Sequence, residues 1–249
     1  LDNIFGSTGS GITIRDVITR LENLEFNLPI NDEEPRNKIG KNQVRDEQPT
    51  HFISIPINKL KSNFDKLNYD LLEFNQEVES FLVPDASMHL TLLTLRAETS
   101  EEIEITKNIM NEIISSEEFK KIGPISLKFK GIGEFYQKVL YSKCESDCID
   151  KLKLLKNLIF DKLSMANVNT AGNYYDFVPH LTVFKIKNNM NNSNMCVNDF
   201  VSEFLWDKYE SFDFGNEIIN EIKLCKMTNI FVSKAYPVEH SVQFVNHHT

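Results

Sequence analysis

Hydrophobic and polar residues follow two different periodicities along most of the chain. From residue 50 onward, short runs that alternate apolar and polar positions predict strands, and longer runs with apolar residues three or four apart predict amphipathic helices. The predicted strands cover residues 51–57, 88–95, 125–136, 138–144, 180–186, 217–227, 229–235 and 240–245. The predicted helices cover residues 61–82, 100–119, 148–166 and 197–209.

Several of these strands are amphipathic, as in "SLKFK", "KVLYSK" and "EIKLCK". A strand with one polar face is typical of antiparallel sheets, so the pattern predicts an α+β layered fold rather than a buried parallel sheet. The two halves of residues 50–249 also share an order of predicted elements. Each half contains a helix and then a strand that opens with His-Leu-Thr, at residues 89–91 and 180–182. We therefore expect one bilobal, pseudo-twofold main domain over residues 50–249.

The first 49 residues have a different character. Residues 1–30 predict a glycine-serine loop and a helix, and Gly6 and Gly9 give the G-x-x-G spacing of a KH-domain loop. We read this segment as a plain loop and short helix, with the tail of a KH domain as the alternative. Residues 31–49 are polar and charged and predict a linker.

Composition and charge narrow the classes of partner. The net charge of −9 argues against a long nucleic-acid groove, which needs a basic face, but permits a short RNA or a nucleotide. The four cysteines show neither zinc-ligand spacing nor the density of a disulfide framework, so we expect reduced thiols. No apolar run approaches the roughly 18–20 residues that span a membrane, and no secretory signal is visible. We expect an intracellular protein, nuclear or cytoplasmic, with no membrane partner.

The repeated His-Leu-Thr strands carry the candidate chemistry. Residues i and i+2 of a strand share a face, so His89 projects with Thr91 and His180 projects with Thr182. Two imidazoles can act as base and acid in one reaction near physiological pH. Threonine hydroxyls can donate to phosphate oxygens, so the four side chains suit in-line cleavage of a phosphoester without a metal.

Two alternatives accompany this interpretation. A lone His-x-Thr strand is usually a structural feature, and only the second copy in an equivalent context favours a shared site. A zinc site is a weaker use of the same histidines, because threonine is a poor ligand and only Asp85 or Asp176 is available nearby to complete it.

At these residues the sequence resembles the two-histidine (2H) phosphoesterase superfamily, which is marked by paired H-x-[ST]-x strands. The resemblance is closer to the A-kinase anchor protein seven-like branch, which also includes the KH-bearing subunit of the activating signal cointegrator complex. It rests on an ordered set of segments: "THFISIPI", "VPDASMHLTLLTL", "ISLKFKGIGEF" with "VLYSKC", "FVPHLTVFKI" and "FDFGNEIINEIKLCKM".

The resemblance implies a bilobal LigT-like fold, with two antiparallel sheets flanked by helices and both histidines in a central cleft. It implies metal-independent and cofactor-free cleavage of 2′,5′-linked or 2′,3′-cyclic phosphodiesters in RNA or nucleotides, and binding of nucleotides such as AMP. By motif position, His89 and His180 would be the acid and base, and Thr91 and Thr182 the phosphate-binding hydroxyls.

Other functions and residues remain open from the sequence. Phe135 and Tyr136 follow Gly131-Ile-Gly133, which we read as a turn that brings an aromatic ring over a base; the alternative is that both are sheet-edge core residues. The alternative function is a nucleotide- or RNA-binding module of a larger protein complex, of the transcription-coactivator or repair type, with little turnover. A third is a protein-interaction scaffold that uses the helix at residues 197–209. The oligomeric state is not predicted.

Overall fold

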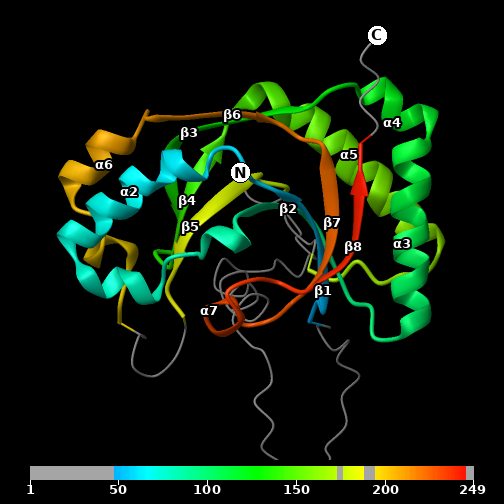
Figure 1. Ribbon diagram of the computed structural model, residues 1–249, viewed down its shortest axis with the longest axis horizontal. Coiled ribbons are helices and arrows are strands. Elements are labelled where there is room, and N and C mark those ends of the chain that lie inside the picture. The colour runs from blue at the N-terminus through cyan, green and yellow to red at the C-terminus, as the bar shows by residue number, and fades with distance from the viewer. Residues whose placement is uncertain (1–47, 173–175, 188–193, 245–249) are drawn as a thin grey trace, which may run out of the picture.

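Two four-stranded antiparallel sheets form the framework of the computed structural model, which describes residues 48–172, 176–187 and 194–244 (Figure 1). The first sheet has the order β2-β1-β7-β8 and the second the order β5-β4-β3-β6. Their bounds are β1 (His51–Pro56), β2 (His89–Leu95), β3 (Ser126–Phe135), β4 (Val139–Cys144), β5 (His180–Lys185), β6 (Asp213–Ile218), β7 (Glu221–Lys226) and β8 (Val238–Gln243). Each sheet contains one of the two histidine strands at its edge.

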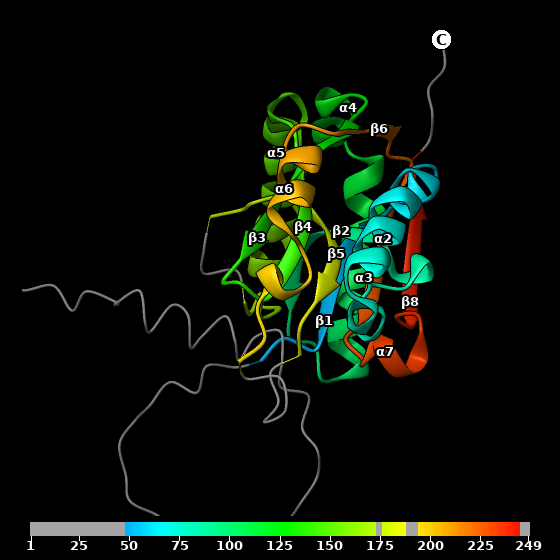
Figure 2. The ribbon, with the colours of Figure 1, turned by 90° about the vertical axis from the view of Figure 1, so that its left-hand side faces the viewer.

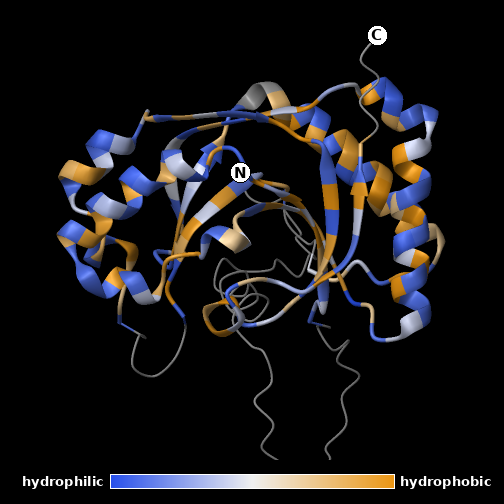
Figure 3. Cartoon of the chain, viewed as in Figure 1, coloured by the Kyte–Doolittle hydropathy of each residue, from blue (hydrophilic) through white to orange (hydrophobic). Residues whose placement is uncertain are grey.

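Helices flank the two sheets at opposite ends of the molecule. In Figure 1, α2 and α6 lie at the left, and α3, α4 and α5 lie at the right; Figure 2 brings α2 and α6 to the front. The helical elements are α2 (Lys61–Phe74), η1 (Gln76–Ser80), η2 (Asp85–Ser87), α3 (Ser100–Ser115), α4 (Glu117–Ile122), α5 (Ser146–Met165), η3 (Val197–Asp199), α6 (Glu203–Tyr209) and α7 (Ile230–Ser233). The longer helices carry hydrophilic and hydrophobic residues in turn, as helices with one buried face must (Figure 3). None of the helices described here is long and apolar enough to cross a membrane.

The two sheets are joined reciprocally through their histidine strands. The segment that leads into β2 pairs with β5, because the Val83 amide donates to the Val183 carbonyl at 2.9 Å. The segment that leads into β5 pairs with the residue directly after β2, because the Arg96 amide donates to the Asn169 carbonyl at 2.8 Å. Strands β2 and β5 also contact each other directly. The predicted α+β, two-sheet fold is therefore confirmed. Its pseudo-twofold character follows because the segment before each histidine strand pairs at the histidine strand of the other sheet.

Several element predictions differ from the structure. The strand predicted over residues 217–227 is divided between β6 and β7. The helices predicted over residues 100–119 and 197–209 are each two helices, α3 with α4 and η3 with α6. The helix predicted over residues 61–82 ends at Phe74, because Asn75 is extended and its side chain accepts from the Glu77 amide to start η1 instead. The strand predicted over residues 229–235 contains the short helix α7, which Asn229 caps by accepting from the Phe231 amide. The predictions for residues 1–30, and for residues 31–49 up to residue 47, lie outside the described residues.

Candidate active site

The two histidine strands have the same pattern of burial. In both β2 and β5 the histidine and threonine are half-buried, and the residue between them is buried. Leu90 and Leu181 are each 0% exposed and anchor the opposite face in the core. The structure therefore places His89 with Thr91, and His180 with Thr182, on one partly exposed face of each strand, and the strands contact each other where the sheets meet.

A β-bulge occurs at the same position in both strands. In the β1–β2 pair the register passes from Leu93 to Thr91, and in the β4–β5 pair it passes from Phe184 to Thr182. The skipped residues are Leu92 and Val183, each three positions after its histidine. A bulge breaks the alternation of a strand and increases its local twist. Two buried residues therefore follow each threonine, while the histidine and threonine keep their partly exposed face.

Each imidazole is fixed by a hydrogen bond to the backbone carbonyl two residues before it. The Nδ1 atom of His89 lies 2.6 Å from the Ser87 carbonyl oxygen, and Nδ1 of His180 lies 2.8 Å from the Val178 carbonyl oxygen. A carbonyl oxygen can only accept, so Nδ1 carries the proton in both rings and Nε2 is the basic nitrogen of the neutral form. Both histidines thus present the same nitrogen for proton transfer.

Two aromatic rings pack against His89. The Phe52 centroid lies 4.9 Å from the His89 centroid, and the Tyr236 ring meets His89 edge to face at 5.4 Å. Phe52 and Tyr236 also contact each other at 4.7 Å. Phe52 comes from the neighbouring strand β1, and Tyr236 comes from the loop between α7 and β8. Together with the Nδ1 bond, these contacts fix the orientation of the imidazole.

His180 is packed in the same way by a phenylalanine and a tyrosine. Phe135 lies 4.9 Å from the His180 ring and Tyr141 lies 5.4 Å from it, and these two aromatic rings stack on each other at 4.1 Å. Burial, and secondarily the Glu134 carboxylate, raises the pKa of Tyr141, so its hydroxyl stays protonated. Sequence reasoning singled out Phe135 but missed Tyr141, and it missed both rings that pack against His89.

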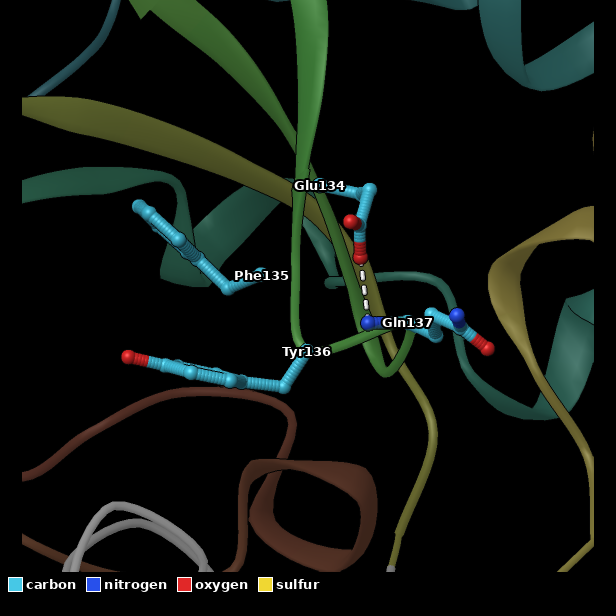
Figure 4. A pocket seen from close by; sticks show the side chains of 4 residues that line it. All are labelled: Glu134, Phe135, Tyr136 and Gln137. Atoms are coloured by element: carbon cyan, nitrogen blue, oxygen red, sulfur yellow. Dashed lines mark hydrogen bonds between the residues drawn. The ribbon is translucent and has the colours of Figure 1, made fainter. Parts of the chain in front are cut away.

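A pocket of about 540 Å³ lies at the turn between β3 and β4, lined by Glu134, Phe135, Tyr136 and Gln137 (Figure 4). The Lys138 amide donates to the Phe135 carbonyl at 2.9 Å, so Tyr136 and Gln137 are the central residues of a two-residue turn. Both have positive φ, 51° and 57°, which a type I′ turn requires and which favours glycine or asparagine. The Glu134 carboxylate accepts from the Gln137 amide and holds this turn.

The rings of Phe135 and Tyr136 point to the same side of this turn, whereas Gln137 points to the other (Figure 4). Their centroids are 6.5 Å apart, and 45% of the Tyr136 residue surface is exposed. The sequence prediction that a turn at Gly131–Gly133 presents these rings was wrong about the turn. Both glycines lie inside β3, where Gly131 has a φ of 71° beside a register shift. A Cβ at Gly131 would lie 2.2 Å from the Glu210 carbonyl oxygen, so close packing explains that glycine.

The other residues considered from the sequence, which are aspartates, a further histidine and the cysteines, are not part of this candidate site. The described residues contain no group of three or more His, Cys, Asp or Glu side chains that could hold a metal ion, so neither Asp85 nor Asp176 completes the zinc site considered above. His51 is 2% exposed in β1, and its Nδ1 bonds Thr50 Oγ1 at 2.8 Å. All four cysteines are free.

Comparison with known proteins identifies the family. Residues 49–244 match the model of the AKAP7 2'5' RNA ligase-like domain. The chain belongs to this family of two-histidine phosphoesterases. It is 28% identical over 206 residues to A-kinase anchor protein 7 isoform gamma of Homo sapiens, a match that covers 80% of this chain and 58% of that protein. The resemblance to the anchor-protein branch that the sequence predicted is therefore confirmed.

Two further matches cover most of the chain, one in sequence and one in fold. The chain is 26% identical over 192 residues to the RNA 2′,3′-cyclic phosphodiesterase of Aquifex aeolicus (strain VF5), covering 75% of this chain and 90% of that one. The crystal structure of E. coli LigT complexed with 3′-AMP aligns with a TM-score of 0.56 at 12% identity, over 80% of this chain and 99% of that chain. The chain therefore belongs to the two-histidine phosphoesterase family and has the LigT fold, as the sequence predicted.

Proposed function

We propose that this two-histidine phosphoesterase is a metal-independent phosphodiesterase that cleaves 2′,5′-linked or 2′,3′-cyclic phosphodiesters of RNA or nucleotides. The observation that carries the proposal is the duplicated histidine geometry. His89 and His180 sit at the same place in equivalent strands, with the same nitrogen bonded to the backbone. Two such groups supply one base and one acid, which is what displacement at phosphorus requires.

The reaction uses both imidazoles once. One histidine enters neutral, and its Nε2 takes the proton of the attacking water or ribose hydroxyl as that oxygen bonds to phosphorus. The other enters as imidazolium and gives its Nε2 proton to the ribose oxygen whose bond to phosphorus breaks. The two strands are equivalent, so the roles of base and acid exchange when the reaction runs in the other direction.

Thr91 and Thr182 bind the non-bridging oxygens of the scissile phosphate in this proposal. Each hydroxyl lies on the same strand face as its histidine. Charge on the non-bridging oxygens changes as the new bond forms, and fixed donors stabilise it without reorganisation. Phe135 packs His180, and Tyr136 offers an exposed ring on which a base can stack.

The names of related proteins support this substrate class. One relative is an RNA 2′,3′-cyclic phosphodiesterase, and LigT, which shares the fold, has been crystallised with ATP, NADP⁺ and 3′-AMP. These ligands also favour a second candidate function, a nucleotide-binding module with little turnover. The same pocket and the same aromatic rings would serve that role, and only turnover separates the two.

The test is a substrate panel with the purified chain in excess EDTA. It contains adenosine 2′,3′-cyclic phosphate, 2′,5′-diadenylate and the matching 3′,5′-diadenylate. We expect turnover of at least one of the first two substrates and none of the third. Saturable binding of 3′-AMP with no product from any substrate would replace the enzyme by the binding module. Turnover that is lost in EDTA and restored by a divalent metal would contradict the mechanism.

A further inference from the structure

A lysine that follows β5 contacts a helix of the other half of the molecule. Lys187 follows β5, and its ammonium lies 3.9 Å from the centroid of the Phe231 ring in α7, a contact between a cation and an aromatic face. The helix α7 belongs to the other half of the molecule, since it connects β7 to β8 (Figure 1). The Lys187 ammonium is thus held at a fixed place between the two halves.

Another cation, Lys234, acts on the charge of Lys187. Burial lowers the pKa of Lys187, and the positive charge of Lys234 lowers it further. None of the salt bridges found in residues 48–172, 176–187 and 194–244 involves either lysine. The two lysines create a local positive potential in a chain whose net charge is −9. A bound anion would offset the repulsion between the two ammonium groups.

The backbone ties Lys234 to the histidine site. Its carbonyl oxygen accepts from the Ser87 hydroxyl at 3.0 Å, and the Ser87 carbonyl in turn accepts from Nδ1 of His89 at 2.6 Å. Two residues further along, the Tyr236 ring packs on His89. The end of α7, which carries Lys234 and against which Lys187 packs, therefore lies next to His89.

Lys234 also occupies a position that normally favours another residue. It ends α7 in the left-handed conformation, with a φ of 64°, where glycine is the common choice. A side chain kept in this conformation despite the strain calls for an explanation. A cationic side chain required at the end of α7 is such an explanation.

We propose that Lys187 and Lys234 form a second anion site, which binds a phosphate of the substrate other than the phosphate that is cleaved. The inference rests on the proposed phosphodiesterase function and makes its substrate more specific. Substrates with at least one further phosphate, such as 5′-phosphorylated nucleotides and short oligonucleotides, are preferred. A nucleoside cyclic phosphate, whose single phosphate occupies the histidine site, leaves the lysine pair unused.

The experiment compares substrates that share one scissile bond. One pair is adenosine 2′,3′-cyclic phosphate with and without a 5′-phosphate, and the other is 2′,5′-diadenylate with and without a 5′-triphosphate. The variant is Lys187→Gln/Lys234→Gln. The control is Lys121→Gln/Lys153→Gln, which removes the same charge from exposed lysines of α4 and α5. We measure kcat/KM in EDTA at several salt concentrations.

The wild type and the control should prefer the substrate with the additional phosphate in at least one pair. The variant should lose this preference about 3- to 10-fold, chiefly through KM, while its kcat/KM for the substrate with the lone phosphate stays within twofold. The salt dependence of log kcat/KM should also fall, by about 0.7 for each phosphate that the variant no longer neutralises. An unchanged preference in the variant, or no preference in the wild type, would overturn the anion site.

Binding of inorganic tripolyphosphate separates failure of this site from failure of the proposed function. If the wild type turns over no substrate, the phosphodiesterase proposal fails, and the lysine pair is tested by titrating tripolyphosphate alone. Saturable binding that the Lys187→Gln/Lys234→Gln variant weakens and the control does not would support the site. Equal binding by all three proteins, or no binding by the wild type, would overturn it.

Discussion

Leu92 and Val183 occupy equivalent places in the two histidine strands: each is the residue at which its strand bulges, three positions after the histidine. The bulge sits between the partly exposed His-x-Thr segment and the buried residues that follow it. Because the same distortion occurs in both halves, the two histidines are positioned by equivalent backbone geometry. This equivalence supports an assignment of paired roles to the two side chains.

The threonine hydroxyls should contribute to turnover rather than to folding. Thr91→Val and Thr182→Val keep the shape of the side chain but remove the donor to the phosphate. We expect each to lower kcat/KM by about 10- to 100-fold, because a hydrogen bond to a charged oxygen is lost. Thr→Ser at either position keeps the hydroxyl and should retain most activity. Valine variants as active as the wild type would remove the threonines from the proposed mechanism.

Tyr136 should bind the base of the substrate. Tyr136→Ala removes the exposed ring at the pocket, and we expect KM to rise by about 5- to 100-fold, since stacking of one base on an aromatic ring contributes about 1–3 kcal/mol. Tyr136→Phe retains the ring and should behave like the wild type. Equal KM values for the alanine and phenylalanine variants would show that no base stacks there.

The β3–β4 turn should trade stability for function. Gln137→Gly relieves the positive φ of 57° at this position, so it should stabilise the fold by about 1 kcal/mol and raise Tm by about 2–4 °C. The same change frees the backbone next to Tyr136 and should weaken substrate binding. Thermal unfolding and KM are measured on the same preparation. A glycine variant with a lower Tm would mean that the turn stores no strain.

His51 should make stability depend on pH. Burial is the main cause that lowers the pKa of His51. Its Nδ1 is the donor to Thr50 Oγ1, because that hydroxyl donates its own proton to the Ala97 carbonyl at 3.0 Å. The Nε2 atom is buried without a partner among the described residues. A second proton on this ring would therefore have no acceptor there.

The sign of the pH effect follows. The folded pKa lies below the unfolded value of about 6.5, so the contribution of His51 to stability is complete above that pH. It is lost as the pH falls from about 6.5 toward the lower folded value, because the unfolded chain then binds the proton that the folded chain does not. Urea unfolding at pH 7.5 and at pH 5.5 should show the loss, and His51→Gln should reduce it. An unchanged difference in the variant would contradict the assignment.

The chain pattern predicted the α+β class and the two histidine strands because both depend on alternation, which is a local property. The two-sheet LigT-like fold came from the family resemblance. The burial of Leu90 and Leu181 opposite the histidines follows directly from the period of two in a strand. The bulges could not be predicted in the same way. Leu92-Leu93 and Val183-Phe184 are pairs of adjacent apolar residues, which on their own indicate only a deeply buried strand.

The aromatic residues around the histidines were missed for a different reason. Tyr141 reaches His180 because β4 pairs with β5, and Phe52 contacts His89 from the neighbouring strand β1. Strand order is a long-range property that one sequence does not reveal. Tyr236 lies in a loop after α7, and the β-branched and aromatic run Ile230–Val232 predicted a strand there. The residue that could have indicated a helix instead is Asn229, which caps α7.

The turn at Tyr136 and Gln137 was misplaced because glycine is normally the strongest turn signal. The turn was therefore predicted at Gly131 and Gly133. Both residues lie inside the strand, where close packing against Glu210 and Tyr141 leaves no room for a Cβ. The actual turn uses residues that carry a side chain at positive φ, which local preference disfavours. Such disagreements between local preference and structure are expected at functional sites.

The most direct test of the paired-histidine mechanism is kcat/KM in EDTA for the wild type, His89→Ala, His180→Ala and the double variant, with the substrate that the panel identifies. Each single variant should lose about 10²–10⁴-fold while keeping the wild-type Tm within a few degrees. The double variant should be little worse than either single variant, because base and acid act as a unit. A single variant that keeps more than about a tenth of wild-type activity, or losses that multiply in the double variant, would contradict the mechanism.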